Sequence, residues 1–260
     1  MFRKIFVFMG YTLLTAIPAA YLLFSSQLNS EGINRVKCTH IKVTVLDSAV
    51  NRFVTPEEIK EMIRVEGITV SESKLKHINQ FELENLLNNW SAVKYSQVYV
   101  TGRGVLAVDI VQRRPVLRLE TANGGFYIDD TAYMFPLIRS FTSYVPVVTG
   151  NIPVSVTPGY RGDGEKKNSW VQKIKDLGLY LERDSFWNSM VEQIHIDSTG
   201  NIMLVPRVGK FDIVFGEPDN IDFKFKKLEA FYKKVIPAFG WENYYKVDVQ
   251  IGRASCRERV

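Results

Sequence analysis

The chain has 260 residues, of which 46% are hydrophobic and 23% are charged, and this balance excludes a disordered chain and a chain wholly embedded in a membrane. Its 33 basic and 28 acidic residues give a net charge of +5. The basic residues are scattered and not gathered on one helix, so we expect no nucleic-acid partner.

The first predicted element is a transmembrane helix. Ile5–Phe24 is an uncharged apolar run of about 20 residues, which is long enough to cross a bilayer core. Arg3 and Lys4 precede it, so the positive-inside rule predicts a cytoplasmic tail at residues 1–4 and the bulk of the chain outside the cytoplasm. The alternative is a cleaved signal peptide, whose apolar core would be only about 7–15 residues long. We therefore expect an uncleaved anchor at residues 5–25.

A strand and two helices are predicted beyond the anchor. Ile41, Val43 and Val45 alternate with polar residues, a period of two that is typical of a strand with one buried face. The segment TPEE at Thr55–Glu58 predicts a helix start, because it is a capping box with proline at the first helical position. Apolar stripes at helical spacing follow in both helices, at Ile59, Met62 and Ile63 and then at Leu83, Leu86, Leu87 and Trp90.

Two more strands complete this domain, at Tyr95–Thr101 and Val105–Val111. They join at Gly102–Gly104, where glycine permits the positive φ of a hairpin. The order of strand, helix, helix, strand and strand resembles a POTRA domain, a small module of membrane-attached proteins that organises other polypeptides outside the cytoplasm. We place this domain at residues 38–114.

The exit from this domain resembles that of one protein family. Val111–Val116 reads VQRRPV, similar to the arginine–proline exit from the POTRA domain in the FtsQ/DivIB family of bacterial cell-division proteins. Phe126–Phe135 predicts two short strands about a turn at Asp129 and Asp130, and it resembles the tyrosine–aspartate hairpin that opens the family's second domain. Val145–Gly150 is similar to the family's proline–hydrophobic–threonine–glycine segment.

The second domain, at residues 115–250, is predicted to be mixed and rich in β-strands. Pro115 cannot donate to a sheet, so we expect it to end pairing and redirect the chain. The further expected elements are a loop at Thr157–Asn168, a helix at Ser169–Leu181, strands at Val191–Asp197, Asn201–Val205 and Phe211–Phe215, a helix at Ile221–Val235, and a terminal strand that begins at Tyr245–Gln250. In the last helix, Phe225, Leu228 and Tyr232 share one face and lysines take the opposite one.

Three segments of this domain most resemble FtsQ proteins of the Bacteroidetes type: Leu204–Gly209, Ile213–Gly216 and Lys224–Leu228. The predicted fold class is therefore α+β, with a single N-terminal transmembrane helix, a POTRA domain of the order βααββ, and a mixed, β-rich domain.

The segment 251–260 is set aside from this prediction. It reads IGRASCRERV, breaks the strand pattern, and can be encoded by a nucleotide sequence that resembles a common sequencing-library adapter. We interpret it as a non-native tail on a C-terminally truncated chain. Without Cys256, the one remaining cysteine is Cys38, which cannot form an intrachain disulfide. We expect a buried or unpaired thiol at Cys38, with lipid attachment as the alternative.

No catalytic, cofactor or metal site is predicted, and we expect no enzyme. The histidines are far apart and lack metal-ligand spacing: His40, His77 and His195. Asp129 and Asp130 are explained better by a turn than by paired catalytic carboxylates. The glycines of Gly159–Gly164 lack the spacing of a phosphate-binding loop.

The resemblance to the FtsQ/DivIB family implies a non-enzymatic scaffold of cell division, with a short cytoplasmic tail and a bulk in the periplasm, anchored in the inner membrane at the division septum. The family's β domain binds the small bitopic proteins FtsB and FtsL, with FtsB adding a strand to its terminal edge. The resemblance also implies contacts with other septal proteins through the POTRA domain. On this chain the implied partner-binding residues are Tyr244, Tyr245, Lys246, Val247, Asp248, Val249 and Gln250.

Alternatives stay open at this stage. The residues of the terminal edge could simply close the sheet. Because the family's strand continues past the position of Gln250, we expect the chain as written to fold its POTRA domain and to bind FtsB-like partners weakly or not at all. A POTRA-bearing envelope assembly or secretion accessory protein is one alternative function, and an anchored cell-wall enzyme is another.

Overall fold

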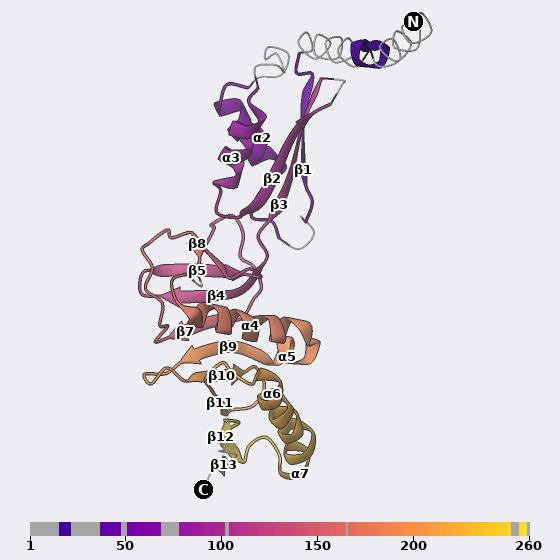
Figure 1. The fold of residues 1–260 in the computed structure, drawn as a ribbon. Coiled ribbons are helices and arrows are strands. Elements are labelled where there is room, and N and C mark those ends of the chain that lie inside the picture. The colour runs from indigo at the N-terminus through magenta and orange to yellow at the C-terminus, as the bar shows by residue number, and fades with distance from the viewer. Residues whose placement is uncertain are drawn as a thin grey trace, which may run out of the picture. The chain divides into compact units, whose positions relative to one another are not determined.

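A computed structural model describes residues 16–21, 37–47, 51–68, 78–101, 104–164, 166–250 and 255–258 (Figure 1). The chain divides into two compact units: the first comprises Met1–Ser48 and Val54–Gln112, and the second comprises Ala49–Phe53 and Arg113–Val260.

Only part of the predicted membrane anchor can be compared with the structure. Residues 16–21 are helical, while residues 1–4 and the remainder of 5–25 lie outside the described residues. Within the part of the chain that the structure describes, no helix is both long and apolar enough to span a bilayer.

The first unit has a three-stranded sheet with two helices, and its order confirms the predicted strand–helix–helix–strand–strand pattern (Figure 1). Strand β3 (Val105–Gln112) is central, parallel to β1 (His40–Val45) and antiparallel to β2 (Val93–Val100). Helices α2 (Pro56–Val65) and α3 (Gln80–Asn88) lie between β1 and β2 in sequence.

Local sequence explains how these helices begin. The Thr55 hydroxyl accepts from the main-chain N–H of Glu58, and the Glu58 carboxylate accepts from the N–H of Thr55, so the predicted capping box is confirmed. At the start of α3, the side chain of Asn79 accepts from the N–H of Glu82. Trp90 is a correction to the predicted stripe, because α3 ends at Asn88 and leaves this residue outside the helix.

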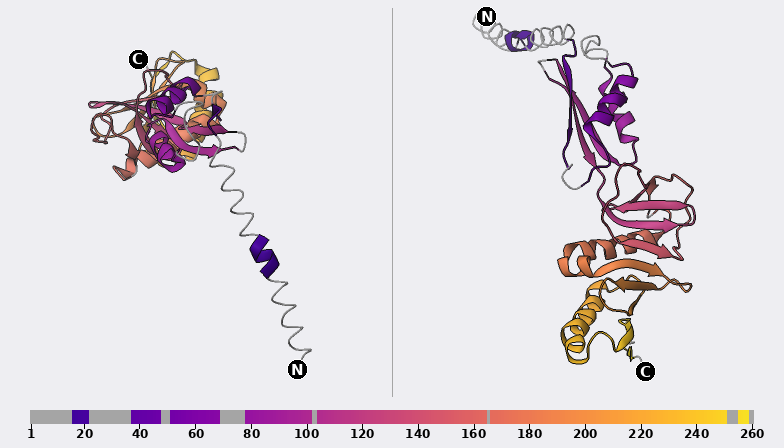
Figure 2. Two further views of the ribbon diagram at one scale, coloured as in Figure 1. Left: turned by 90° about the horizontal axis from the view of Figure 1, so that it is seen from above. Right: turned by 180° about the vertical axis from the view of Figure 1, so that it is seen from behind.

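The second unit is built on a ten-stranded mixed sheet of order β13-β12-β11-β10-β9-β7-β4-β5-β6-β8. Its elements are β4 (Pro115–Thr121), β5 (Gly124–Asp129), β6 (Tyr133–Pro136), β7 (Val147–Gly150), β8 (Gly162–Asp163), α4 (Ser169–Arg183), α5 (Ser185–Met190), β9 (Val191–Ile196), β10 (Ile202–Pro206), β11 (Asp212–Gly216), α6 (Ile221–Ala230), the π-helical turn η2 (Phe231–Val235), α7 (Ile236–Phe239), β12 (Tyr244–Asp248) and β13 (Ser255–Glu258). The right-hand view of Figure 2 shows the strands and helices of this unit from behind, in pink to yellow.

The core of this unit lies between the sheet and its helices. Gly178 on α4 approaches β4 so closely that an added Cβ would lie 2.7 Å from side-chain carbons of Val116 and Leu117. Farther along the sheet, the Phe225 ring of α6 lies 5.4 Å from the Phe215 ring of β11, centroid to centroid. Glycine at position 178 therefore sets how closely α4 can pack on the sheet.

Three predictions for this unit need correction. Pro115 does not end pairing but begins β4, opposite Asp129 of β5, because proline is tolerated at the first residue of a strand. The last helix does not stop at Val235, since α7 continues it to Phe239 before Gly240 adopts a positive φ of 80°. The short strand β8 also lies inside the predicted loop Thr157–Asn168.

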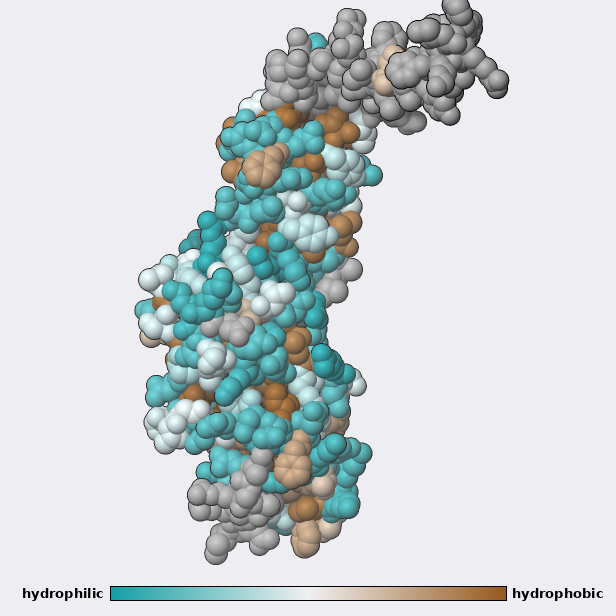
Figure 3. All heavy atoms as spheres, in the orientation of Figure 1, coloured by the Kyte–Doolittle hydropathy of each residue, from teal (hydrophilic) through white to brown (hydrophobic). Residues whose placement is uncertain are grey.

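On the face drawn in Figure 3, hydrophobic residues are scattered among hydrophilic ones over the described parts of the molecule. Scattered apolar residues are normal on the surface of folded domains, so candidate sites have to be found from local geometry.

Candidate functional site

Strand β12 carries most of the residues that the sequence analysis assigned to partner binding. Tyr244, Val247 and Val249 are buried, whereas Tyr245 is 41% exposed. Lys246, Asp248 and Gln250 are half-buried. These seven residues therefore combine apolar anchors in the core with polar groups near the surface.

The hydrogen-bonding edges of β12 are both occupied. On one side it runs parallel to β11, in a register that pairs Ile213 with Val247. On the other side the backbone of Ser255–Glu258 forms β13 and pairs antiparallel with β12. The sequence predicted a terminal edge at residues 244–250 and a non-native tail after it. The structure differs, since four tail residues cover that edge.

The end of β12 is held down from two directions. Lys227 of α6 donates from Nζ to the carbonyl oxygens of Gln250, at 2.9 Å, and Val249, at 3.5 Å. Gly216 packs closely against the side chain of Gln250, because a Cβ on this glycine would come within 2.7 Å of Gln250 Nε2. These contacts fix the course of the chain as it leaves the strand, and nothing in the spacing of Lys227 along the sequence indicated them.

Another lysine of α6, Lys224, is buried, although the lysines of this helix were predicted to lie on its polar face. Lys224, only 2% exposed, lies on the covered side of the helix and not opposite Phe225. Its Nζ donates to the Glu217 carbonyl oxygen at 2.7 Å and to Asp219 Oδ1 at 2.5 Å. The hydrogen bond from Lys224 Nζ to Asp219 holds the pKa of the Asp219 carboxyl below its ordinary value. Burial is tolerated because the ammonium group is both paired and hydrogen-bonded.

Asp129 occupies the predicted turn between β5 and β6, but it also has a tertiary role. Its carboxylate is fully buried and accepts from Arg113 Nη1 at 2.8 Å. The Arg113 guanidinium carbon lies 3.4 Å from the centroid of the Tyr133 ring. This arrangement ties the start of the second unit to its first hairpin and offers no free carboxylate for acid–base chemistry.

The remaining candidate ligands that the structure describes do not come together as a metal site. His40 and His195 are described and lie in different units, while His77 lies outside the described residues. Across the described ranges, no three His, Cys, Asp or Glu side chains gather as metal ligands would. Cys38 is a free, fully buried thiol, which confirms the prediction, and burial raises its pKa.

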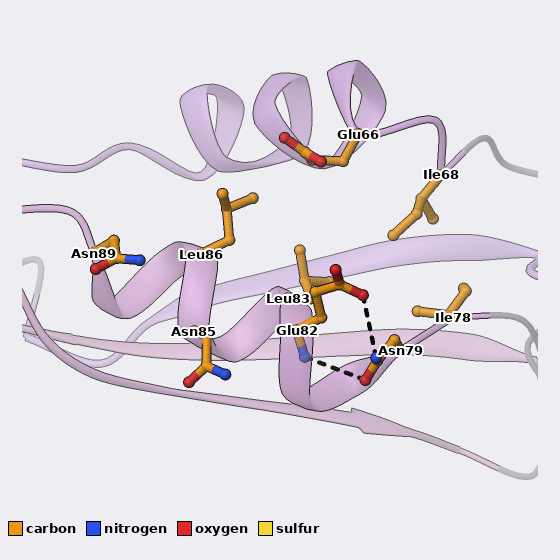
Figure 4. A pocket seen from close by; sticks show the side chains of 9 residues that line it. All are labelled: Glu66, Ile68, Ile78, Asn79, Glu82, Leu83, Asn85, Leu86 and Asn89. Carbon is orange, nitrogen blue, oxygen red and sulfur yellow. Dashed lines mark hydrogen bonds between the residues drawn. The ribbon is translucent and has the colours of Figure 1, made fainter.

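Two of the hollows formed by the described residues are larger than about 400 Å³, and neither was predicted from the sequence. One, of about 410 Å³, lies between α2 and α3 in the first unit (Figure 4). Its wall combines apolar Ile78, Leu83 and Leu86 with acidic Glu66 and Glu82. The other, of about 610 Å³, lies in the second unit beside η2, and four of the nine residues that line it are aromatic. Only the high density of aromatic residues between positions 186 and 241 hinted at the second hollow.

Comparison with family models gives two matches, and they agree with the folds of the two units. Residues 36–111 match a POTRA-like domain. Residues 114–253, more than half of the chain, match the model described as FtsQ/DivIB, C-terminal related, and the match ends inside the segment that the sequence analysis set aside. A comparison with curated proteins found no match.

These matches connect the fold to a biological process. The domains imply a role in cell division, within a family of non-enzymatic scaffolds that act through protein–protein interactions. The POTRA-like first unit and the β-rich second unit follow one another in the order expected from the sequence. The chain belongs to the FtsQ/DivIB family.

Proposed function

We propose that this protein is a septal scaffold that recruits small bitopic division proteins of the FtsB/FtsL type by strand addition at β12. The POTRA domain would contact other septal proteins. A helix at residues 5–25 would anchor the chain in the inner membrane, with residues 1–4 in the cytoplasm and the bulk in the periplasm. No cofactor is part of this function.

The pairing of β12 with β13 is the observation that carries the proposal. Val249 donates its N–H to the Val214 carbonyl oxygen of β11 at 3.1 Å. Because successive residues of a strand direct their main-chain groups to opposite edges, Lys246 and Asp248 direct theirs away from β11. That outer edge accepts Ser255–Glu258 in antiparallel register. An edge that pairs with a segment of its own chain has the geometry to pair with a strand of another.

The binding test compares the 260-residue chain with a chain that ends at Gln250. Removing residues 251–260 uncovers the outer edge, so the shorter chain should capture a soluble FtsB-like segment at least tenfold more efficiently. Binding is measured by titration with the fluorescently labelled segment. Equal, weak binding by both chains would contradict strand addition at this edge.

Two substitutions distinguish main-chain pairing at this edge from contacts of the Lys246 side chain. In the shorter chain, Lys246→Pro removes an outward N–H, while Lys246→Ala keeps it. We expect the proline variant to lose partner binding and the alanine variant to keep it, with the melting temperatures of both checked by circular dichroism. Loss in both variants would assign the effect to the lysine side chain and not to strand pairing.

Location is tested in dividing cells. A fluorescent protein fused to the cytoplasmic N-terminus should give a band at mid-cell, and a fusion lacking residues 5–25 should lose it. An even signal around the cell periphery would contradict a septal role and would favour an envelope assembly function.

A further inference from the structure

The aromatic hollow of the second unit has the size of a binding site. Its volume is about 610 Å³, within the range of about 300–1,000 Å³ typical of ligand pockets. Four rings line it: Phe186 and Trp187 of α5, Tyr232 of η2, and Trp241 just before β12. A single π-helical turn inside an α-helix is frequent at functional sites.

The four rings form one connected aromatic surface. Tyr232 is at its centre, with ring centroids 5.9 Å from Phe186, 5.6 Å from Trp187 and 5.5 Å from Trp241. Phe186 is 46% exposed, while Trp187 and Tyr232 are almost fully buried. The cation–π contacts found among the described residues all involve other rings, so these four faces are not used by a lysine or arginine of the described chain.

The charged residues at the hollow are mainly acidic. Asp184, Glu229 and Lys233 contribute two carboxylates and one ammonium group. Lys233 Nζ lies 2.5 Å from Glu229 Oε1, so it compensates one of the two negative charges. Asp184 Oδ1 accepts from the N–H groups of Phe186 and Trp187, and no cation pairs with Asp184 among the described residues. One negative charge thus remains beside the rings.

Aromatic faces and a carboxylate together favour a cation with an apolar stem. A guanidinium group stacks on tryptophan and tyrosine faces, and its fork pairs with carboxylates. The methylene stem of an arginine also gains from apolar surroundings, which Met190 and Val208 provide at this hollow. A neutral aromatic side chain would use the rings but would leave the acidic charge without a partner.

We propose that this hollow binds an arginine side chain presented by a partner polypeptide, with its guanidinium group over the Trp241–Tyr232 surface and beside Asp184. The site is separate from the hydrogen-bonding edge of β12, and it supplies a side-chain anchor that strand pairing alone does not. It goes beyond the proposed function, and it is tested without any division protein, so the two proposals can fail independently.

The test uses the four tryptophans of the full chain. Labelled with 5-fluorotryptophan, the chain gives one fluorine resonance for each of Trp90, Trp170, Trp187 and Trp241. The probe is N-acetyl-arginine methylamide, and the matched neutral probe is N-acetyl-citrulline methylamide. We expect saturable shifts of the Trp187 and Trp241 resonances with the arginine probe, and none for Trp90 and Trp170.

Citrulline has almost the shape of arginine but no charge, so it should bind at least threefold more weakly. This factor lies in the range of about two- to fivefold that one exposed cation–π contact provides. Equal binding of the two probes would overturn the choice of a cation. A shift of all four resonances, or of none, would overturn the site itself.

Two variants locate the contacts. Trp241→Leu removes one aromatic face, and Glu229→Gln removes a carboxylate and frees Lys233 to repel the probe, so each should weaken arginine binding at least threefold. Glu242→Gln is the control, because Glu242 is exposed next to Trp241 but does not line the hollow. Unchanged resonances of Trp90 and Trp170 report that each variant is folded. Equal weakening by the Glu242 control would refute a local acidic contribution.

Discussion

Two hairpin turns of the second unit have the same local structure and different surroundings. Asp129–Tyr133, with the sequence DDTAY, joins β5 to β6, and Asp197–Asn201, with the sequence DSTGN, joins β9 to β10. In each turn the aspartate Oδ1 accepts from the N–H of the threonine two residues later at 2.8 Å, from its hydroxyl at 2.7 Å, and from the N–H four residues later at 2.9 Å. The shared pattern of Asp and Thr therefore specifies the turn locally.

The fourth residue of both turns is left-handed, with a φ of 63° at Ala132 and 87° at Gly200. Each donates its N–H to the carbonyl oxygen of the first aspartate at 3.1 Å. One turn thus carries alanine where the other has glycine, which is the residue that adopts this conformation without steric cost.

The aspartates differ in their tertiary partners. Asp129 is fully buried and pairs with Arg113, whereas the partners of Asp197 are neutral groups of Thr199 and Asn201. The same motif is therefore an ordinary surface turn in one place and half of a buried ion pair in the other. The chemistry of the motif decides the turn, and a distant arginine decides how much the turn contributes to stability.

Breaking the ion pair should have the largest effect. Asp129→Asn keeps the amide oxygen as an acceptor for the turn but leaves Arg113 without its counter-charge, and we expect a loss of about 3 kcal/mol in the free energy of unfolding. Urea denaturation followed by tryptophan fluorescence measures it, since Trp170, Trp187 and Trp241 belong to this unit.

The matched substitution Asp197→Asn should cost much less, because no buried charge loses a partner. The double variant with Arg113→Met should recover part of the loss caused by Asp129→Asn. Equal losses for the two aspartate variants would show that the turn, and not the ion pair, carries the stability.

Alanine at the left-handed position of the second turn should have an intermediate effect. A Cβ on Gly200 would meet nothing within 4 Å, so Gly200→Ala tests the backbone conformation alone. We expect a loss of about 1 kcal/mol, measured as a shift in the urea midpoint. Ser198→Ala, at an exposed residue of the same turn, is the control. No loss at Gly200 would mean that alanine adopts the left-handed conformation of these turns without a measurable cost.

The smallest effect should be on the pH dependence of stability. The hydrogen bond from Thr199 lowers the pKa of Asp197 below its ordinary value. A lowered folded-state pKa contributes stability that is present above the unfolded-state pKa of about 3.9 and is lost as pH falls through the folded-state value. Asp197→Asn should therefore flatten the fall in melting temperature below about pH 4.

Asp212→Asn, at the exposed start of β11, is the control for the removal of one negative charge. If both variants flatten the fall in melting temperature at low pH equally, the effect reflects net charge and not the hydrogen bonds of the turn.

Local features could be predicted from the sequence because neighbouring residues create them. The capping box at Thr55, the turn at Asp129 and the alternation of strand residues depend on groups a few positions apart. The family was also predictable, since its motifs are contiguous segments such as Val111–Val116. The candidate edge at β12 was recognised as a strand for the same reason.

Tertiary structure decided the features that join residues far apart in sequence. Lys224 appears on the polar side of its helix in sequence, yet the chain before the helix folds back to pair with it. Lys227 reaches the end of β12, and β13 covers the outer edge of that strand. The aromatic hollow combines residues of α5, η2 and the segment before β12. A sequence determines which local turns and periods are favourable, but burial and charge pairing arise only when distant segments meet in the folded chain.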